Sequence, residues 1–271
     1  MFRKSLKYII IGVIAVLVSY LWSKYEKQAP QPVYRDYADI IREGILHVAT
    51  EYNTTGYFIN NDTLAGFHYD LIRLFAEDKG LQANIVPEMS FEKRMEGLKS
   101  GKYDIIASDM VVNSELKESV LLTDPLILSK LVLVQRKADR YDPSYIYSQV
   151  DLAGKTLHVV KGSPAILRIQ NLENEIGDTI YIREVEKYGS EQLISMVAHA
   201  DIDYVVCEEN IAKAVIDSLP SLDISTKIGF TQFYSWAVNK NSPALLDTLN
   251  SWIAKMKNGE DFIRIQQKHL P

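Results

Sequence analysis

The chain has 271 residues, of which 47% are apolar and 24% are charged, a composition that fits one or two globular domains and excludes a disordered or fibrous chain. Its formal net charge is −5, so the broad cationic surface that holds a phosphate backbone is not expected, and we exclude nucleic acid as a partner. Cys207 is the one cysteine of the sequence, which excludes an intrachain disulfide and a metal site built on several thiolates.

Residues 1–27 are predicted to be a signal anchor. Basic residues precede an apolar run over residues 8–22, which is typical of an export signal. The positions after this run lack the small residues that a signal peptidase needs, so we expect an uncleaved, single-pass transmembrane helix in the inner membrane, with the remaining chain in the periplasm. A cleaved signal is the alternative. Residues 28–39, which contain two prolines, are predicted to be an extended stalk.

The remaining chain alternates short apolar strands with amphipathic helices. The predicted strands cover residues 45–49, 82–86, 105–107, 156–160 and 204–207. The predicted helices cover residues 69–79, 91–100 and 190–198, with a further helix after residue 242. This alternation favours an α/β fold with mainly parallel sheets that are covered by helices.

Two β-rich segments, residues 126–136 and 233–238, are expected to connect two lobes. The segments 100–107 and 200–206 share a pattern of helix end, tight turn and buried strand, which indicates two similar lobes. Ligands bind beyond the carboxyl ends of strands in open parallel sheets, so this architecture predicts a ligand cleft between the lobes.

Four stretches carry a resemblance to known proteins, namely residues 66–71, 101–107, 123–126 and 152–156. In order and spacing they resemble signature segments of the family 3 extracellular solute-binding proteins. A second resemblance is carried by residues 50–53, 161–163, 202–204, 209–212, 222–226 and 236–238. These segments resemble the binding-protein-like half of the membrane-bound lytic murein transglycosylase F family. In that family a lytic domain follows the binding half, whereas this chain ends at Pro271, so we expect no lytic domain and no enzymatic activity.

The resemblance implies a two-lobed periplasmic binding protein of type II with an interlobe ligand cleft. It implies a lobe 1 built from residues 40–128 and 229–271 and a lobe 2 built from residues 129–228. It also implies ligand contacts at Glu51, Phe91, Ser108, Asp109, Val111, Leu116, Ser163 and Glu208. We add Tyr57, an aromatic residue in a glycine-containing loop after the first strand.

Two of these positions depart from the amino-acid binders of the family. Leu116 stands where the family has an arginine that binds the α-carboxylate, and Val111 stands where a hydroxyl is usual. Glu208 matches an acid that binds the ligand's amine, and Glu51 and Asp109 would share its cleft. We therefore expect a ligand with an amine and no free α-carboxylate near Leu116, such as a polyamine, an amidated amino acid or a peptide bound by its N-terminus.

Each site residue also has a structural alternative. Asp109, Ser163 and Glu208 could cap helix N-termini, and Phe91 could pack in the core. His68 and His158 have no second ligand at metal spacing, so they are interpreted as structural, and neither a metal nor a cofactor is expected.

The expected function is therefore binding of a small-molecule ligand, either for delivery to an ABC transporter permease or for sensing. The alternative is a non-catalytic, regulatory relative of the transglycosylases that acts with a cell-wall enzyme in peptidoglycan turnover. A dehydratase or hydrolase built on the same fold would require a cleft carboxylate with a perturbed pKa.

Overall fold

The computed structural model describes residues 12–22, 34–138 and 142–271. Residues 12–22 are helical and exposed, and among the described residues no helix has the length and apolar character needed to cross a bilayer. The other parts of the predicted signal anchor, and residues 28–33 of the predicted stalk, lie outside the described residues. Residues 34–271 form a compact unit of their own.

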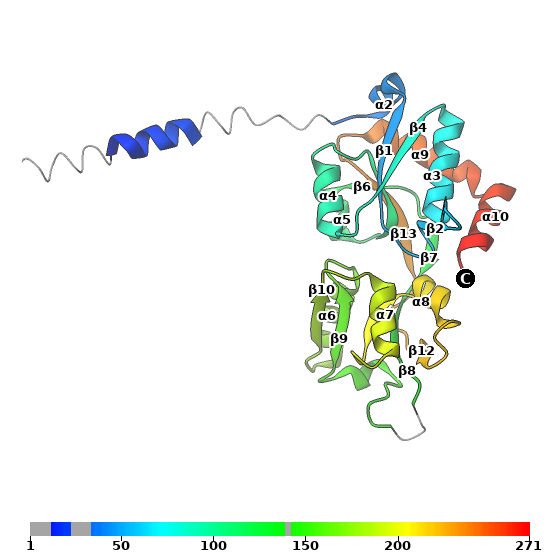
Figure 1. The fold of residues 1–271 in the computed structure, drawn as a ribbon. Helices are drawn as coiled ribbons and strands as arrows, with labels where there is room; N and C mark the ends of the chain where they lie inside the picture. The colour runs from blue at the N-terminus through cyan, green and yellow to red at the C-terminus, as the bar shows by residue number, and fades with distance from the viewer. Residues whose placement is uncertain (1–11, 23–33, 139–141) are drawn as a thin grey trace, which may run out of the picture. The chain divides into compact units, whose positions relative to one another are not determined.

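The first sheet of this unit defines lobe 1 (Figure 1). Its strand order is β4-β1-β5-β13-β6, with β7 paired to β13. β1 runs parallel to β4 and β5, whereas β13 runs antiparallel to β5, β6 and β7. The strands are β1 (Ile45–Thr50), β4 (Gln82–Pro87), β5 (Ile105–Val111), β6 (Leu121–Leu122), β7 (Ile127–Ser129) and β13 (Gln232–Val238).

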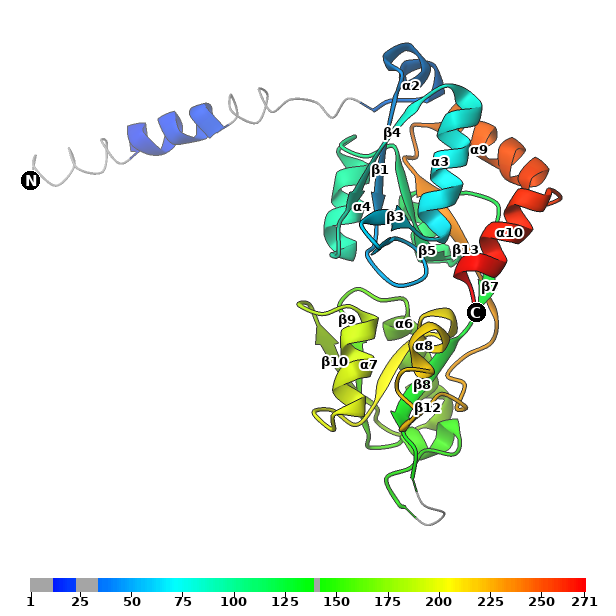
Figure 2. The ribbon, with the colours of Figure 1, turned by 45° about the vertical axis from the view of Figure 1, so that its right-hand side comes forward.

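The second sheet defines lobe 2, with strand order β10-β9-β11-β8-β12. β9 is parallel to β10 and β11, and β8 is antiparallel to β11 and β12. The strands are β8 (Leu131–Arg136), β9 (Thr156–Val160), β10 (Tyr181–Val185), β11 (Val205–Glu208) and β12 (Leu222–Asp223). Figure 2 shows the two sheets in separate bodies of the ribbon.

Helices cover both sheets, as the alternating pattern predicted. Lobe 1 carries α2 (Tyr37–Glu43), α3 (Phe67–Lys79), α4 (Phe91–Lys99), α5 (Ser114–Ser119), α9 (Pro243–Met256) and α10 (Glu260–His269), and a hairpin of β2 (Phe58–Asn60) and β3 (Thr63–Ala65). Lobe 2 carries the 3₁₀ helix η1 (Gln149–Leu152) and helices α6 (Ala165–Ile176), α7 (Ser190–Ala198) and α8 (Glu209–Ile216). The α/β fold with two lobes is therefore confirmed, whereas the predicted lobe boundaries at residues 128 and 228 stay a prediction.

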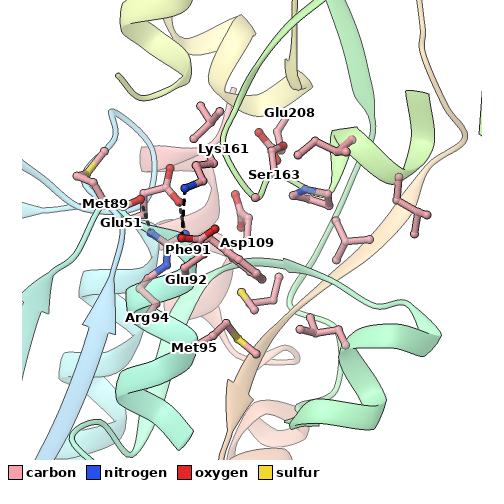
Figure 3. Close-up of a pocket in the computed structure, with 18 of the residues that line it drawn as sticks. Glu51, Met89, Phe91, Glu92, Arg94, Met95, Asp109, Lys161, Ser163 and Glu208 are labelled. Carbon is pink, nitrogen blue, oxygen red and sulfur yellow. Dashed lines mark hydrogen bonds and ion pairs between the residues drawn. The ribbon is translucent and has the colours of Figure 1, made fainter. Parts of the chain in front are cut away.

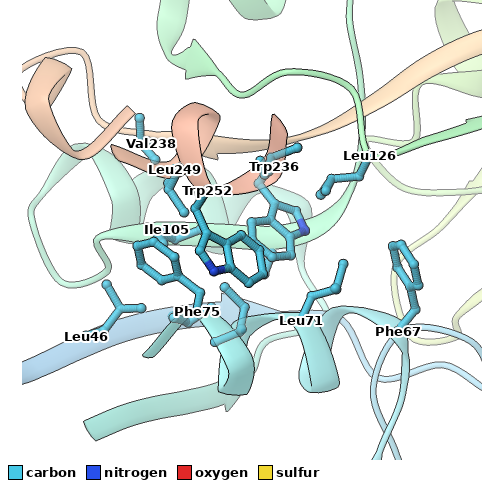
Figure 4. Close-up of a cluster of buried hydrophobic side chains, with 14 of the residues drawn as sticks. Leu46, Phe67, Leu71, Phe75, Ile105, Leu126, Trp236, Val238, Leu249 and Trp252 are labelled. Atoms are coloured by element: carbon cyan, nitrogen blue, oxygen red, sulfur yellow. The ribbon is translucent and has the colours of Figure 1, made fainter. Parts of the chain in front are cut away.

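Each lobe has its own hydrophobic core, which makes it a stable platform for one side of a site. In lobe 1, Trp236 from β13 and Trp252 from α9 lie among aliphatic residues of α3 (Figure 4). The rings of Phe75 and Trp252 meet edge to face with 5.4 Å between centroids, a favoured aromatic geometry. The cores of lobe 2 lie around β8, β9 and β11.

The folded unit begins earlier than the predicted stalk allowed. Arg35 pairs with the buried carboxylate of Asp104, at 3.1 Å. Asp36 is the N-cap of α2, and its side chain also accepts from the backbone N–H groups of Ala244 and Leu245 at the start of α9. Residues 34–39 are therefore part of lobe 1, because one carboxylate there satisfies free N–H groups of two helices.

A glycine fixes the start of α3. Gly66 has φ of +134°, and a Cβ at this position would lie 2.3 Å from the carbonyl oxygen of Gly56. Only glycine fits here, because an L side chain would collide with backbone. The close approach sets the position of the first turn of α3, which carries His68.

The chain passes between the lobes at two places. Lys130 lies between β7 and β8, and Gly229 lies just before β13. The first crossing is tied to α8, because the Lys130 carbonyl accepts from Glu209 N–H at 2.8 Å and the Lys130 ammonium lies 3.2 Å from the Glu209 carboxylate.

Candidate ligand-binding cleft

A cavity of about 750 Å³ lies between the lobes and is lined by both of them. This volume falls within the usual range of small-molecule sites. Strand ends and helix starts supply its walls, as the strand-end rule predicted. Its lining includes Glu51, Phe91, Glu92, Arg94, Met95, Asp109, Val111, Leu116, Lys161, Gly162, Ser163 and Glu208.

Seven of the nine predicted site residues therefore border one cavity. They are Glu51, Phe91, Asp109, Val111, Leu116, Ser163 and Glu208. Tyr57 and Ser108 are absent from its lining. The Tyr57 ring is buried against Tyr52 and Tyr69, and Ser108 is buried on the opposite face of β5 from Asp109, since side chains alternate along a strand. A ligand contact at these two residues stays a prediction from the sequence.

Helix α4 supplies much of the lobe 1 wall. The Ser90 hydroxyl accepts from the Lys93 N–H and caps this helix. Phe91 and Met95 lie on the cavity side of α4 and pack against a hydrophobic cluster that includes Met110 and Leu116. Phe91 therefore both packs in the core of lobe 1 and lines the cavity.

Arg94 was not predicted as a site residue, yet its buried guanidinium lies at the cavity wall. Its Nη2 donates to Glu51 Oε2 at 2.9 Å (Figure 3), and its Nη1 donates to the carbonyl oxygens of Glu88 and Met89 at 2.6 and 3.0 Å. Glu51 is therefore a cleft acid whose charge is already paired within the protein. The Glu51 carboxylate is balanced by Arg94, which lies on the same helix as Phe91.

Asp109 is held by a buried histidine. His68 Nε2 lies 3.0 Å from Asp109 Oδ1, and the Trp236 indole N–H lies 3.0 Å from His68 Nδ1. Because an indole nitrogen only donates, Nδ1 must accept, and the imidazole proton then lies on Nε2, which donates to Asp109. The ring is thus neutral, and the carboxylate of Asp109 keeps its negative charge toward the cleft. His68, interpreted as structural, positions a site residue.

Glu208 is the acid that lobe 2 contributes. It ends β11 and directly precedes α8. The pKa of its carboxyl group is raised from 4.5 to about 7, chiefly by burial and also by the charges of Glu51 and Asp109, whereas a bond from its own backbone N–H and the charge of Arg94 act in the opposite direction. Among the described residues, no lysine or arginine forms an ion pair with Glu208. Its raised pKa meets the condition set for a dehydratase or hydrolase on this fold, and a binding site that gathers like charges gives the same shift.

Tyr234 brings a buried hydroxyl close to the same acids. Burial raises the pKa of its phenol well above 10, and the charges of Glu208 and Asp109 add to this. Within the part of the chain that the structure describes, its hydroxyl has no hydrogen-bond partner. Tyr234 therefore offers a neutral donor beside two carboxylates.

Three contacts join the lobes at the edge of the cavity. Lys161 Nζ lies 3.5 Å from the Glu92 carboxylate (Figure 3), and the Thr54 N–H donates to Glu191 Oε1 at 2.5 Å. Gly162, with φ of +72°, lies so close to Phe91 that a Cβ there would be 3.2 Å from the ring. Ser163 accepts from Ala165 N–H at 3.2 Å and so helps to begin α6.

Known proteins share both the sequence pattern and the fold. A membrane-bound lytic murein transglycosylase F from Desulfosudis oleivorans is 25% identical over 256 residues, which cover 94% of this chain and 54% of that protein; the chain thus spans about half the length of the curated relatives it matches. A solved mutant of the arginine-binding protein ArgBP from T. maritima has a TM-score of 0.73 and 25% identity, with 86% of this chain and 97% of that chain covered. An ancestral arginine-binding protein bound to arginine has a TM-score of 0.72 and 26% identity, with 83% and 98% covered.

These structures confirm the two-lobed periplasmic binding protein fold. The model of the bacterial extracellular solute-binding proteins, family 3, matches residues 45–271. The match covers both lobes and all the residues that border the cavity. The chain therefore belongs to the bacterial extracellular solute-binding proteins of family 3.

Proposed function

We propose that this chain is a membrane-anchored periplasmic solute-binding protein whose two lobes close on a small ligand. The observation that carries the proposal is the cavity between the lobes, with Asp109 from lobe 1 and Glu208 from lobe 2 on its walls. Because both acids need a counter-charge, a bound ligand would stabilise the arrangement in which the lobes meet. The N-terminal apolar run supports the proposed anchor in the inner membrane.

Binding without turnover is the form of the proposal that the family favours. Family 3 solute-binding domains are non-catalytic, and Glu51 and Asp109 each have a fixed partner in Arg94 and His68. The proposed recipient of the ligand is an ABC transporter permease.

A second candidate is sensing of cell-wall fragments for a peptidoglycan-processing partner. One observation favours it: relatives that match over 94% and 98% of this chain carry the name membrane-bound lytic murein transglycosylase F. In this candidate the same cleft would bind a muropeptide, and the closed form would be recognised by a cell-wall enzyme.

A thermal-shift screen of the full-length chain in mild detergent tests both candidates. The library would hold amino acids, amino-acid amides, amines, short peptides and muropeptides. A ligand at 100 times its Kd should add about 2.7 kcal/mol to stability. A response to muropeptides alone would support sensing, and a response to free small solutes would support transport.

Two variants show whether a response comes from the cleft. Phe91→Ala removes part of a cavity wall and should abolish or weaken the rise in Tm that a compound causes. Phe230→Ala is the matched control, because Phe230 is 87% exposed and is absent from the cavity lining. If no compound raises Tm, or if Phe91→Ala leaves every response unchanged, the proposed function fails.

A further inference from the structure

The cavity wall is divided by chemical character. Asp109 and Glu208 bring carboxylates to it from the two lobes (Figure 3). Phe91, Met95 and Leu116 bring apolar side chains, all from one hydrophobic cluster of lobe 1. A ligand that fills this space must therefore meet an acidic region and an apolar region.

The described ion pairs show which acids lack a counter-charge. Glu51 is paired with Arg94 at 2.9 Å, and Glu92 is paired with Lys161 at 3.5 Å. Asp109 has a neutral histidine as its partner, which orients the carboxylate and leaves its charge in place. Asp109, Glu208 and Glu96 are therefore the lining acids for which the described residues supply no lysine or arginine partner, and of these three Glu96 is exposed.

Asp109 and Glu208 come from facing lobes, so their repulsion opposes closure. A ligand cation placed between them would remove the repulsion and would join the lobes at the same time. Arg94 does not take this place, because its Nη1 and Nη2 atoms donate to Glu88, Met89 and Glu51 and it forms no described ion pair with Asp109 or Glu208.

Part of the cavity lining does not suit a carboxylate. Leu116 and Val111 both border it, and neither side chain can donate a hydrogen bond. A carboxylate placed against these two side chains would gain no hydrogen bond from them in exchange for its lost hydration, which is unfavourable.

We propose, on the basis of the proposed function, that the ligand is an ammonium-bearing molecule with an apolar body and no carboxylate. Its ammonium group lies between Asp109 and Glu208, and its apolar body lies against Phe91, Met95 and Leu116. His68 is a positioning residue for this site, because it fixes Asp109 as an acceptor. Free amino acids are excluded by the same wall that accepts the apolar body.

Calorimetry at pH 7 with a matched set of probes tests the ligand class. Leucinamide has the amine and the apolar body, leucine has a carboxylate in place of the amide, N-acetyl-leucinamide lacks the charge, and putrescine has a second ammonium in place of an apolar end. The same set is repeated with phenylalanine derivatives, so that the result does not depend on the size of one apolar side chain. We expect each amide to bind at least tenfold more tightly than its free amino acid or putrescine, and the acetylated forms to show no heat of binding.

Variants of the full-length chain locate the effect. Glu208→Gln should weaken amide binding at least tenfold, whereas Glu77→Gln, which removes the same charge from an exposed position of α3, should not. Leu116→Arg should narrow or reverse the preference for the amide over the free amino acid.

Equal or tighter binding of the free amino acids overturns the inference, as does equal binding of the acetylated amides. Failure of every amide overturns it too. If another compound class then raises Tm in a manner that depends on Phe91, the proposed function stands and only the ligand class is wrong. If no compound raises Tm in a manner that depends on Phe91, the proposed function and the proposed ligand class are both wrong.

Discussion

Trp236 donates its indole N–H to Nδ1 of His68, and this one hydrogen bond decides what His68 can do for the cleft. It leaves the histidine proton on Nε2, which faces Asp109. A tryptophan in the core of lobe 1 thus controls the hydrogen bonding of an acid in the ligand site.

Replacement of His68 tests this arrangement. His68→Phe would leave the buried indole N–H without an acceptor and Asp109 without a donor, so we expect a loss of about 1–3 kcal/mol in the free energy of unfolding. His68→Gln offers both an acceptor and a donor and should lose less. Urea unfolding of the two variants makes the comparison, and an equal loss in both would contradict the assigned hydrogen bonds.

The stability of the ligand-free protein should fall as pH rises. The pKa of Glu208 is about 7 in the folded state and 4.5 without the fold, so the folded state binds the extra proton between these values. The protonated carboxyl therefore contributes stability that is fully present below about pH 4.5 and is lost as pH rises through about 7. The difference between the two pKa values corresponds to at most about 3 kcal/mol, and opening of the lobes would reduce it.

Glu208→Gln isolates this contribution from the other titrating groups. The facing charges of Glu51, Asp109 and Arg94 stay in place in this variant. The gap between variant and parent stability, measured by urea unfolding at several pH values, should grow in favour of the variant from about pH 4.5 to 7. A gap that is independent of pH would show that Glu208 does not titrate in this range.

The pair of Arg94 and Glu51 should show strong coupling. Arg94→Met leaves the Glu51 carboxylate without its partner, and we expect a loss of about 3 kcal/mol, at the low end for a buried pair because Glu51 keeps some exposure. Glu51→Gln together with Arg94→Met should lose less than the sum of the single changes. Thermal or urea unfolding of the four proteins gives the coupling energy, and additive losses would argue against the pair.

Gly162 allows a test of the contact between the lobes. Gly162→Ala strains a backbone with φ of +72° and also places a Cβ 3.2 Å from the Phe91 ring of the other lobe. Gly154→Ala is the matched control, because its φ is +71° and nothing lies within 4 Å of the added atom. Both should lose about 1–2 kcal/mol from backbone strain, but only Gly162→Ala should also increase the radius of gyration measured by small-angle X-ray scattering. An equal radius for the two variants would contradict a close approach of the lobes at this loop.

The sequence allowed much of the fold to be predicted, because apolar periodicity reports directly on buried faces. The strand at residues 156–160 and the helix at residues 190–198 have the predicted bounds. Strand β5 was predicted to end at Ala107 but continues to Val111. Its last residues include Ser108 and Asp109, whose polar side chains interrupt the apolar pattern that predicts a strand. These residues are in a strand because their backbone pairs with β13.

The site was harder to predict than the fold, since its arrangement depends on distant partners. The resemblance and the strand-end rule brought Asp109 and Glu208 to one cavity. Arg94 was missed because a basic residue in an amphipathic helix is normally exposed. The role of His68 depends on Trp236, which is far away in sequence, and no local pattern connects the two.

The double cap made by Asp36 has a mechanical consequence. It fastens the beginning of the folded unit to α9, while the His269 side chain at the other end lies 2.7 Å from Asp70 of α3. Residues 34 and 271 therefore both belong to lobe 1, and tension between them would be carried by that lobe alone. Lobe 2 is connected to lobe 1 only through the two crossings. A rotation of lobe 2 about these crossings would therefore leave both ends of the folded unit in place.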